Sequence, residues 1–251
     1  MGEDTDLHKI NQELRDAVRA RDEFLAIAAH ELRSPMHALM LQIESVIAVA
    51  RRVGNEELLQ RLERVRVVLD RYVKRASLLL DVSRINAGSM ELSLAQVDIA
   101  EILHEVVDIY AVEAAFNLID IRLTAPAALT GKWDRPAIEQ VIGNLVSNAI
   151  KYGDGKPVDI SLAQKGNRVR LEVKDHGIGV SAEDQARIFG RFEQVVTGRH
   201  RTGFGVGLWL ARALIEAHRG SIEVRSASGQ GTAFIVWLPL DATPTAQDAT
   251  Q

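Results

Sequence analysis

The segment QVIGNLVSNAIKYG, residues 140–153, decides the fold of this chain. Its apolar residues recur at helical spacing, so the segment predicts a helix with one buried face. That face consists of Val141, Ile142, Leu145 and Val146. Asn144 and Asn148 lie one turn apart on another face, where amide oxygens can bind a hydrated Mg2+, and Lys151 can reach a phosphate a turn later. Two solvent-facing asparagines on an ordinary helix are the alternative that this segment alone leaves open.

Three glycine-rich stretches follow this helix. They are DHGIGV (175–180), GFGVGLWL (203–210) and GQGTAF (229–234). Glycine lets the backbone adopt positive φ and approach a ligand closely, and a helix that starts beyond such a turn offers free N–H groups to phosphates. One glycine-rich turn is weak evidence for a ligand site, but three in one small domain predict a nucleotide-binding cradle.

The region around these motifs predicts a mixed α/β domain. Strand-like runs lie at 119–125, 157–164, 167–174, 221–227 and 231–238, and helical patterns lie at about 99–117, 134–151 and 206–219. Runs that follow each other closely, such as those joined at Lys165 and Gly166, predict antiparallel hairpins. We expect the helices to cover one face of a mixed sheet, as an α+β sandwich. Residues 241–251 predict a disordered tail.

Residues 5–88 have a different pattern, with helical periodicity and almost no strand signal. Two seams alternate steps of four and three residues, as in coiled coils. The first comprises Leu25, Ala29, Leu32, Met36, Leu39, Ile43, Val46 and Ala50, and the second Leu58, Leu62, Val65, Leu69, Tyr72, Ala76 and Leu79. RRVGNEE (51–57) lies between them and supplies a helix stop. The pattern predicts an antiparallel hairpin, and because one hairpin leaves its apolar stripes half covered, two are expected to form a dimeric four-helix bundle.

A further pattern precedes the first seam, at Leu7, Ile10, Leu14 and Ala17. Continued forward, it reaches Phe24 and Ala28, one residue out of step with the later seam, and such a shift alters the winding of a coiled coil. The shift is either fraying near the chain start or the place where an upstream signal changes helix packing. On the second interpretation, residues 1–22 are a signalling coiled-coil helix.

The composition narrows the class of protein. The 251 residues are 47% hydrophobic, with a net charge of -4 and a pI near 6.0, so no overall positive field is available to hold nucleic acid or an anionic membrane. No apolar run approaches the ~20 residues that a membrane span needs, and the N-terminus is not a signal peptide. Cysteine is absent, which excludes disulfides and thiolate metal sites. We expect a cytoplasmic protein, or the cytoplasmic part of a larger one.

A reactive histidine is predicted in FLAIAAHELRSPMHALM (24–40). At about 100° per residue, His30 and Ser34 share a flank of the helix that lies off the buried seam. Pro35 lacks a backbone N–H and is expected to bend the helix. Neutral imidazole is a good nucleophile near pH 7 because its unperturbed pKa is about 6.5. Glu31 is the adjacent carboxylate that can accept or orient the second imidazole proton.

The helix and the three glycine-rich stretches together resemble the N, G1, G2 and G3 boxes of the GHKL (Bergerat) ATP-binding fold. Histidine kinases share this fold with Hsp90, gyrase-type ATPases and MutL. IFGRFEQ (188–194) is similar to the F box that histidine kinases place between G1 and G2. The resemblance identifies residues 97–240 as an ATP-binding domain in which Asp175 accepts a hydrogen bond from the adenine amino group.

The same resemblance implies the rest of the nucleotide site. Asn148, with Asn144, binds Mg2+, and residues 193–204 form a lid over the phosphates. The other residues implied at the nucleotide are Lys151, Tyr152, Gly177, Gly179, Phe189, Phe192, Gly203, Gly205, Gly207, Leu208, Gly231 and Thr232. In the Hsp90, gyrase and MutL branches a glutamate at the position of Asn144 activates water, whereas an amide cannot act as a general base. The site is therefore expected to hold ATP without hydrolysing it, so the phosphoryl group needs another acceptor.

AAHELRSPMHAL resembles the H box of HisKA-type histidine kinases. By that match His30 is the phospho-acceptor, Glu31 is the base, and Ser34 orients water during phosphatase action on a partner. Ser34 replaces the usual threonine, which keeps the hydroxyl but loses the methyl group that restricts its rotamer. LLDVSRINAG (79–88) is similar to the family's ending of the second helix, so residues 23–90 are identified as the dimerisation and phosphotransfer hairpin.

These resemblances imply the catalytic core of a two-component sensor histidine kinase, a homodimer that autophosphorylates His30 with ATP and Mg2+. The phosphoryl group would then pass to an aspartate on a response-regulator receiver domain, and neither nucleic acid nor a membrane span is expected. One alternative is a GHKL ATPase that does mechanical work. Another is an ATP-binding scaffold or a phosphatase-dominant regulator. The other histidines are not expected to take part in catalysis. We expect His8, His104, His200 and His218 on the surface, the side chain of His176 in solvent, and no catalytic role for His37.

Overall fold

The computed structural model describes residues 35–66, 68–69, 72–73, 92–193 and 205–241. The chain forms two compact units, Met1–Met90 and Glu91–Gln251. Across the described ranges, no helix is both long enough and apolar enough to cross a bilayer.

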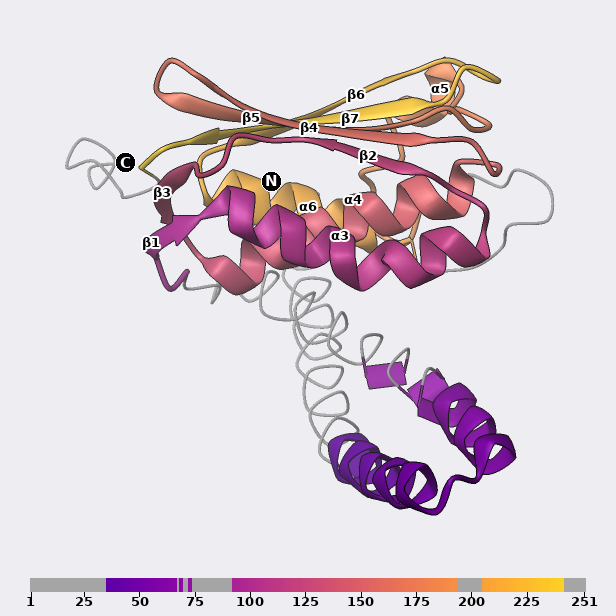
Figure 1. Ribbon diagram of the computed structural model, residues 1–251. Coiled ribbons are helices and arrows are strands. Elements are labelled where there is room, and N and C mark those ends of the chain that lie inside the picture. Colours follow the sequence, from indigo (N-terminus) through magenta and orange to yellow (C-terminus); the bar gives the residue numbers. More distant parts are fainter. Residues whose placement is uncertain (1–34, 67, 70–71, 74–91, 194–204, 242–251) are drawn as a thin grey trace, which may run out of the picture. The chain divides into compact units, whose positions relative to one another are not determined.

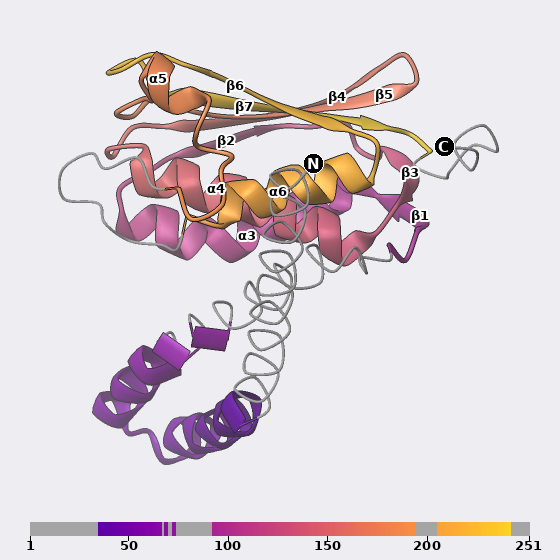
Figure 2. The same ribbon diagram turned by 180° about the vertical axis from the view of Figure 1, so that it is seen from behind.

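The second unit alternates strands and helices in a two-layer arrangement. Its strands are β1 (Ala95–Asp98), β2 (Ile121–Thr124), β3 (Thr130–Trp133), β4 (Val158–Lys165), β5 (Arg168–Asp175), β6 (Ser221–Ser226) and β7 (Thr232–Pro239). Its helices are α3 (Ile99–Phe116), α4 (Arg135–Tyr152), α5 (Ala182–Gln185) and α6 (Gly207–Ala217). The three long helices lie side by side on one face of the large sheet (Figure 1, and from behind in Figure 2). The predicted α+β sandwich is confirmed.

The large sheet is mixed and has the order β2-β4-β5-β7-β6. β2 pairs with β4 in parallel, and the other neighbours are antiparallel. β4 and β5 form the predicted hairpin, in which Lys165 pairs with Arg168. Alternate residues of both strands are buried, because one face of the sheet meets the helices and the other does not. The domain core therefore lies between the sheet and the three long helices.

Three short elements were not predicted from the sequence. β1 and β3 have four residues each and pair antiparallel in a separate two-stranded sheet, and α5 also has four residues. Such lengths give too few periods for a recognisable pattern. β3 instead depends on Trp133, which is completely buried and whose Nε1 donates to the carbonyl of Pro239 at 2.7 Å.

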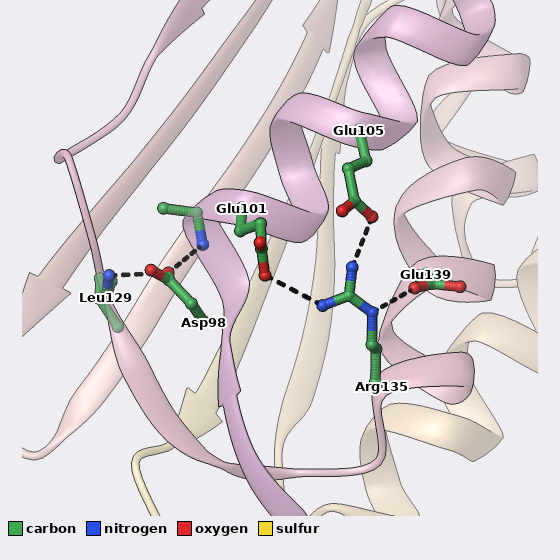
Figure 3. A network of polar contacts seen from close by, with 7 residues as sticks. Asp98, Glu101, Glu105, Leu129, Arg135 and Glu139 are labelled. Carbon is green, nitrogen blue, oxygen red and sulfur yellow. Dashed lines mark hydrogen bonds and ion pairs between the residues drawn. The ribbon is translucent and has the colours of Figure 1, made fainter.

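An arginine on α4 holds α3 and α4 together (Figure 3). Nη1 of Arg135 donates to Glu101 at 3.1 Å, and Nη2 donates to Glu105 at 2.5 Å. Nε bonds Glu139 on the same helix at 2.8 Å. Beside this cluster, Asp98 caps α3, and the hydrogen bond from the N–H of Leu129 is the main reason why the pKa of Asp98 lies below its usual range. The first turns of both helices are thus fixed by polar contacts.

The start of α4 and the end of α6 meet at Asp134 and His218. Asp134 caps α4 by accepting the N–H of Ala137 at 3.0 Å, and its other oxygen accepts the N–H of Ser93 at 2.7 Å. His218 is 0% exposed; its Nδ1–H donates to the carbonyl of Leu214 at 2.7 Å, and its Nε2 accepts the N–H of Asp134 at 3.0 Å. The expectation that His218 lies on the surface is wrong, because both of its ring nitrogens are used inside the domain.

Acid is expected to destabilise the second unit through His218. Burial lowers the pKa of this imidazole, and a protonated ring cannot accept the N–H of Asp134. The unfolded chain therefore takes up a proton more readily than the folded chain, so the free energy of unfolding falls as the pH drops below about 6.5, by at most about 1.4 kcal/mol per pH unit for one proton. Denaturant titrations at several pH values check this. His218→Gln, which cannot titrate, should show a shallower dependence on pH, and equal slopes in the two proteins would contradict the assignment.

The first unit contains a helical hairpin. Its helices cover residues 35–53 and 56–66. Gly54 between them has φ +70°, and Asn55 caps the second helix by accepting the N–H of Leu58 at 3.0 Å. The predicted stop and turn are therefore present. Since the described helix begins at residue 35, the expected bend at the preceding turn lies outside the described residues.

The predicted seams of the hairpin divide into a covered row and an exposed row. Ile47, just off the predicted seam, and Ala50 are buried. Five seam residues remain 40–53% exposed: Leu39, Val46, Leu58, Val65 and Tyr72. Because these side chains are large and apolar and both helices supply them, the hairpin presents an apolar face that its own two helices do not cover. We call these five residues the open seam.

Candidate active site

The predicted asparagine pair lies on α4, where Asn144 contacts the start of α6. Nδ2 of Asn144 donates to the carbonyl of Gly207 at 3.2 Å. A carbonyl can only accept, so this contact identifies the amide nitrogen and does not use the amide oxygen. Asn144 and Asn148 are both half-buried, and amide oxygens are ligands that suit Mg2+. The residues present therefore fit a metal ion, while the predicted apolar face of α4 is buried: Val141, Ile142, Leu145 and Val146.

The N-terminus of α6 can receive an anion. α6 begins at Gly207, and the residue before it makes no side-chain capping bond. The first N–H groups of a helix have no intrahelical partner and lie at the positive end of its dipole. Gly205 has φ +66°, and a Cβ at this position would overlap the carbonyl of Glu193, so this turn requires glycine. Leu208 is half-buried in the first turn of the helix.

The adenine acceptor predicted at the end of β5 is a buried carboxylate. Asp175 is 3% exposed, and its Oδ1 accepts the N–H groups of Gly177 at 2.9 Å and of Thr232 at 3.3 Å. Burial raises the pKa of Asp175 above its usual range, although the two N–H donors and the neighbouring His176 act in the opposite direction. The carboxylate thus joins two glycine-rich turns and remains an acceptor inside the domain.

The glycines of these turns are needed because backbones pack against each other. A Cβ at Gly177 would overlap the carbonyl of Tyr152, and a Cβ at Gly231 would overlap the carbonyl of Asp175. Gly179 has φ +67° and faces the carbonyl of Ala227 in the same way. From the sequence, these glycines are expected to let the backbone approach a ligand closely. The structure adds that the turns cannot approach α4 and each other with any larger residue.

The C-terminus of α4 carries the predicted Lys151 and Tyr152. Nζ of Lys151 donates to the hydroxyl of Tyr152 at 2.8 Å and lies 4.6 Å from the centre of its ring. The carbonyl of Tyr152 accepts the N–H of Ile178 at 3.3 Å. α4 therefore contacts α6 through Asn144 and the 175–180 turn through its last residue, which brings the N, G1 and G2 elements together.

The two phenylalanines of the predicted F box have different environments. Phe189 belongs to the core, where its ring meets that of Phe234 edge to face with centroids 6.2 Å apart. Phe192 is exposed and has φ +63°. The guanidinium of Arg191 lies 5.0 Å from the ring of Phe192 and 5.6 Å from that of Trp209 on α6. The F box thus reaches α6 through aromatic and cationic contacts.

Several predicted residues lie outside the described ranges. These are His30, Glu31, Ser34 and Gly203, with most of the predicted lid. Their roles stay predictions. His37, close behind the predicted acceptor, is an exposed residue of the helix 35–53.

Sequence reasoning missed two residues that hold the 175–180 turn. Oγ of Ser226 accepts the N–H of Val180 at 2.8 Å. Nε2 of Gln185 donates to the carbonyls of Val180 at 3.2 Å and Ser226 at 2.8 Å. No motif marks a serine or a glutamine at these positions, because Val180 and Ser226 are 46 residues apart.

His176 also has a partner that the sequence did not indicate. Its Nε2 lies 2.7 Å from Oδ2 of Asp159 on β4. The side chains of the two residues are 37% and 43% exposed. The expectation that His176 points into solvent is corrected: the ring is bound at the edge of the turn that carries Asp175.

Two protein families match the chain. The family described as Histidine kinase-, DNA gyrase B-, and HSP90-like ATPase matches residues 133–242. The family described as His Kinase A (phospho-acceptor) domain matches residues 20–88. The first range contains every predicted nucleotide-binding residue, and the second contains His30, Glu31 and Ser34.

Sensor kinases are among the curated relatives. The sensor-like histidine kinase SenX3 of Mycobacterium tuberculosis (strain ATCC 25618 / H37Rv) is 33% identical over 224 residues, which are 88% of this chain and 54% of the relative. The sensor protein kinase WalK of Staphylococcus saprophyticus is 30% identical over 240 residues, which are 94% of this chain and 39% of the relative. The chain therefore spans about half the length of such relatives or less.

Two solved structures resemble different shares of the chain. Full-length ShkA in complex with AMPPNP has a TM-score of 0.63 and 29% identity, covering 89% of this chain and 47% of that protein. The catalytic domain of the histidine kinase ThkA has a TM-score of 0.53 and 27% identity, covering 61% of this chain and 98% of that domain.

Proposed function

The chain belongs to the sensor histidine kinases and contains their phospho-acceptor and ATPase domains, and from this premise we propose that it transfers the γ-phosphoryl group of ATP to His30. One imidazole nitrogen forms a bond to the γ-phosphorus, the bond from this phosphorus to the β,γ-bridging oxygen breaks, and ADP leaves with the electron pair. The other imidazole N–H becomes acidic, and Glu31 accepts or orients its proton.

ATP would bind along α4, with its purine at Asp175 and its phosphates at the N-terminus of α6. The buried carboxylate of Asp175 supplies an acceptor for the adenine amino group. The uncapped start of α6 supplies N–H donors. Asn148, with Asn144, would hold Mg2+, which when bound neutralises phosphate charge. The chain's own residues thus orient the nucleotide and leave its terminal phosphate for an acceptor on the other unit.

The observation that carries the proposal is the asparagine at position 144. A water-activating site needs a general base there, and the Asn144 amide is neutral and already donates to the carbonyl of Gly207. ATP held without such a base can persist until a protein nucleophile arrives. His30, with Glu31 beside it, is the nucleophile that the sequence offers.

The phosphoryl group would pass from His30 to an aspartate on a receiver domain. Leu41 is 68% exposed on the described helix 35–53. The helical periodicity predicted for residues 24–40 would place His30 within about 20° of it at 100° per residue. A receiver domain that docks at this surface would bury this exposed apolar side chain. Ser34 would orient water when the kinase removes the phosphoryl group from the receiver domain as a phosphatase. Because the donor is ATP, we place these reactions in the cytoplasm.

Chemical stability of the product tests the proposal. The whole chain is incubated with γ-labelled ATP and Mg2+, and the labelled protein is treated with acid or alkali. A phosphoramidate on histidine is expected to lose its label in acid and keep it in alkali, and addition of a receiver domain should remove it. A chain that acquires no label, or only acid-stable label, would contradict the proposal.

The open seam fits a second copy of the same hairpin, and we propose that the chain dimerises through it. Its five apolar residues come from both helices, as the seam of a four-helix bundle requires. An apolar face of this kind gains free energy by leaving water. Residues 20–88 match the His Kinase A (phospho-acceptor) domain family, which supports a paired hairpin.

A charge in the open seam is expected to separate the dimer. Val46→Glu would bury one unpaired carboxylate from each subunit, which weakens association by on the order of 100-fold or more. Sedimentation velocity or light scattering at low micromolar concentration measures this. Leu41→Glu is the matched control, because it places the same charge at an apolar and more exposed residue on the opposite side of the helix. A Val46→Glu chain that stays dimeric would exclude this face.

A further inference from the structure

Ser226, at the end of β6, is the centre of a hydrogen-bond network behind the Asp175 turn. Its Oγ lies 2.7 Å from the carbonyl oxygen of Gly231, 2.8 Å from the nitrogen of Val180 and 3.0 Å from Oγ1 of Thr232. A hydroxyl has one proton and two lone pairs. These three partners therefore use its whole hydrogen-bonding capacity.

The partners determine which way each proton points. The carbonyl of Gly231 can only accept, so it takes the single proton of Ser226. The N–H of Val180 can only donate, so it occupies one lone pair. The contact with Thr232 then requires Thr232 to donate its hydroxyl proton to Ser226. Toward any ligand, Oγ1 of Thr232 is left as an acceptor only.

The neighbour of Thr232 is an acceptor too. Oδ1 of Asp175 accepts the N–H of Thr232 at 3.3 Å and that of Gly177 at 2.9 Å, and Oδ2 takes part in neither contact. An ionised carboxylate has no proton to offer. Two adjacent buried side chains thus present acceptors and no donor.

We propose that Ser226 is a positioning residue that makes the purine site select a 6-amino group over a 6-oxo group. The inference rests on the proposed function, in which the purine lies at Asp175. Adenine carries a donor at this position, whereas guanine carries an acceptor. An oxygen that meets only acceptors loses the hydrogen bond it made in water, and sites built this way reject the wrong group strongly.

Removing the Ser226 hydroxyl should relax this selection. In Ser226→Ala the proton of Thr232 no longer has its partner, so the hydroxyl can rotate and donate to a 6-oxo group. The carboxylate of Asp175 can at the same time accept from the ring N–H that 6-oxo purines carry next to that oxygen. The variant therefore gains affinity for 6-oxo purines relative to adenine, which general loosening of the turn would not produce.

The test compares the binding of ATP, GTP and ITP to the whole chain by calorimetry with Mg2+. We expect wild type to prefer ATP over both 6-oxo nucleotides by at least about 100-fold, and Ser226→Ala to reduce that ratio by about 10-fold or more. Ser226→Thr keeps the hydroxyl and should restore the ratio. Ser221→Ala, at the other end of the same strand, is the matched control and should leave it unchanged.

The binding results separate a failure of the inference about Ser226 from a failure of the proposed function. ATP and GTP affinities that fall together in Ser226→Ala, with their ratio unchanged, would give Ser226 a purely structural role and overturn the inference. If this variant does not fold, the wild-type affinities still test the inference. Wild-type chain that binds ITP as tightly as ATP would contradict a purine site that presents only hydrogen-bond acceptors. A wild-type chain that binds none of the three nucleotides would overturn the proposed function itself, and the inference with it.

Discussion

His30→Gln is expected to abolish protein labelling by γ-labelled ATP while leaving ATP affinity unchanged. Glutamine has no nucleophilic nitrogen, because its amide lone pair is delocalised into the carbonyl group. The residues proposed to bind ATP all belong to the second unit, Glu91–Gln251, so nucleotide binding does not depend on position 30. We expect the loss of label to be complete, because His30 is the one residue proposed to accept the phosphoryl group.

His37→Gln is the control for this prediction. His37 is exposed on the described helix 35–53 and follows His30 by seven residues, but no carboxylate comes directly after it in the sequence. Label should remain in this variant at the wild-type level. If label survives in His30→Gln and disappears in His37→Gln, then His37 is the phospho-acceptor and the assignment to His30 is wrong.

Asp175→Asn is expected to weaken ATP binding by about 10- to 100-fold. The ionised carboxylate offers a charge-assisted hydrogen bond to the adenine amino group, worth roughly 1.5–3 kcal/mol, and each 1.4 kcal/mol corresponds to about tenfold in affinity. Calorimetry on the variant measures the change. Asp120→Asn, which alters an exposed carboxylate paired with Arg122, should bind ATP normally. Unchanged affinity in Asp175→Asn would remove Asp175 from the adenine role.

The same substitution is expected to stabilise the chain when no nucleotide is bound. Burial raises the pKa of Asp175, so the folded chain holds this proton more tightly than the unfolded chain does. The free energy of unfolding therefore falls as the pH rises through the range above the unfolded value of about 3.9. Asparagine is neutral and can still accept the N–H groups of Gly177 and Thr232. A variant that melts at a higher temperature yet binds ATP more weakly would show that this carboxylate is kept for binding at the expense of stability.

Much of the fold could be predicted because its elements are long and periodic. α4 has 18 residues, enough for its apolar face to be read from spacing alone, and the β4–β5 hairpin follows from alternation around Lys165 and Gly166. β1 and β3 escaped prediction because a four-residue strand gains its stability from partners elsewhere. Trp133, for example, is held by Pro239, which is 106 residues away.

The residues of the candidate site also divide into those that the sequence predicts and those that only the structure reveals. Asn144, Asp175 and the glycines stand in motifs whose spacing reflects their chemistry, so they could be named before any coordinates. Ser226 and His218 stand in no motif, and their roles come from partners 46 and 84 residues away. A sequence shows that a histidine is present, but only the packing shows that both of its ring nitrogens are occupied.

The fate of the γ-phosphate in a single turnover tests the central claim most directly. Excess chain is mixed with γ-labelled ATP and Mg2+, and label on protein is counted against free inorganic phosphate over time, for wild type and for His30→Gln. We predict that the label in wild type moves to the protein, with little free phosphate, and that His30→Gln produces neither product and leaves ATP intact. Inorganic phosphate released at the same rate by both proteins would contradict the claim, because water would then be the acceptor and the site would be that of an ATPase.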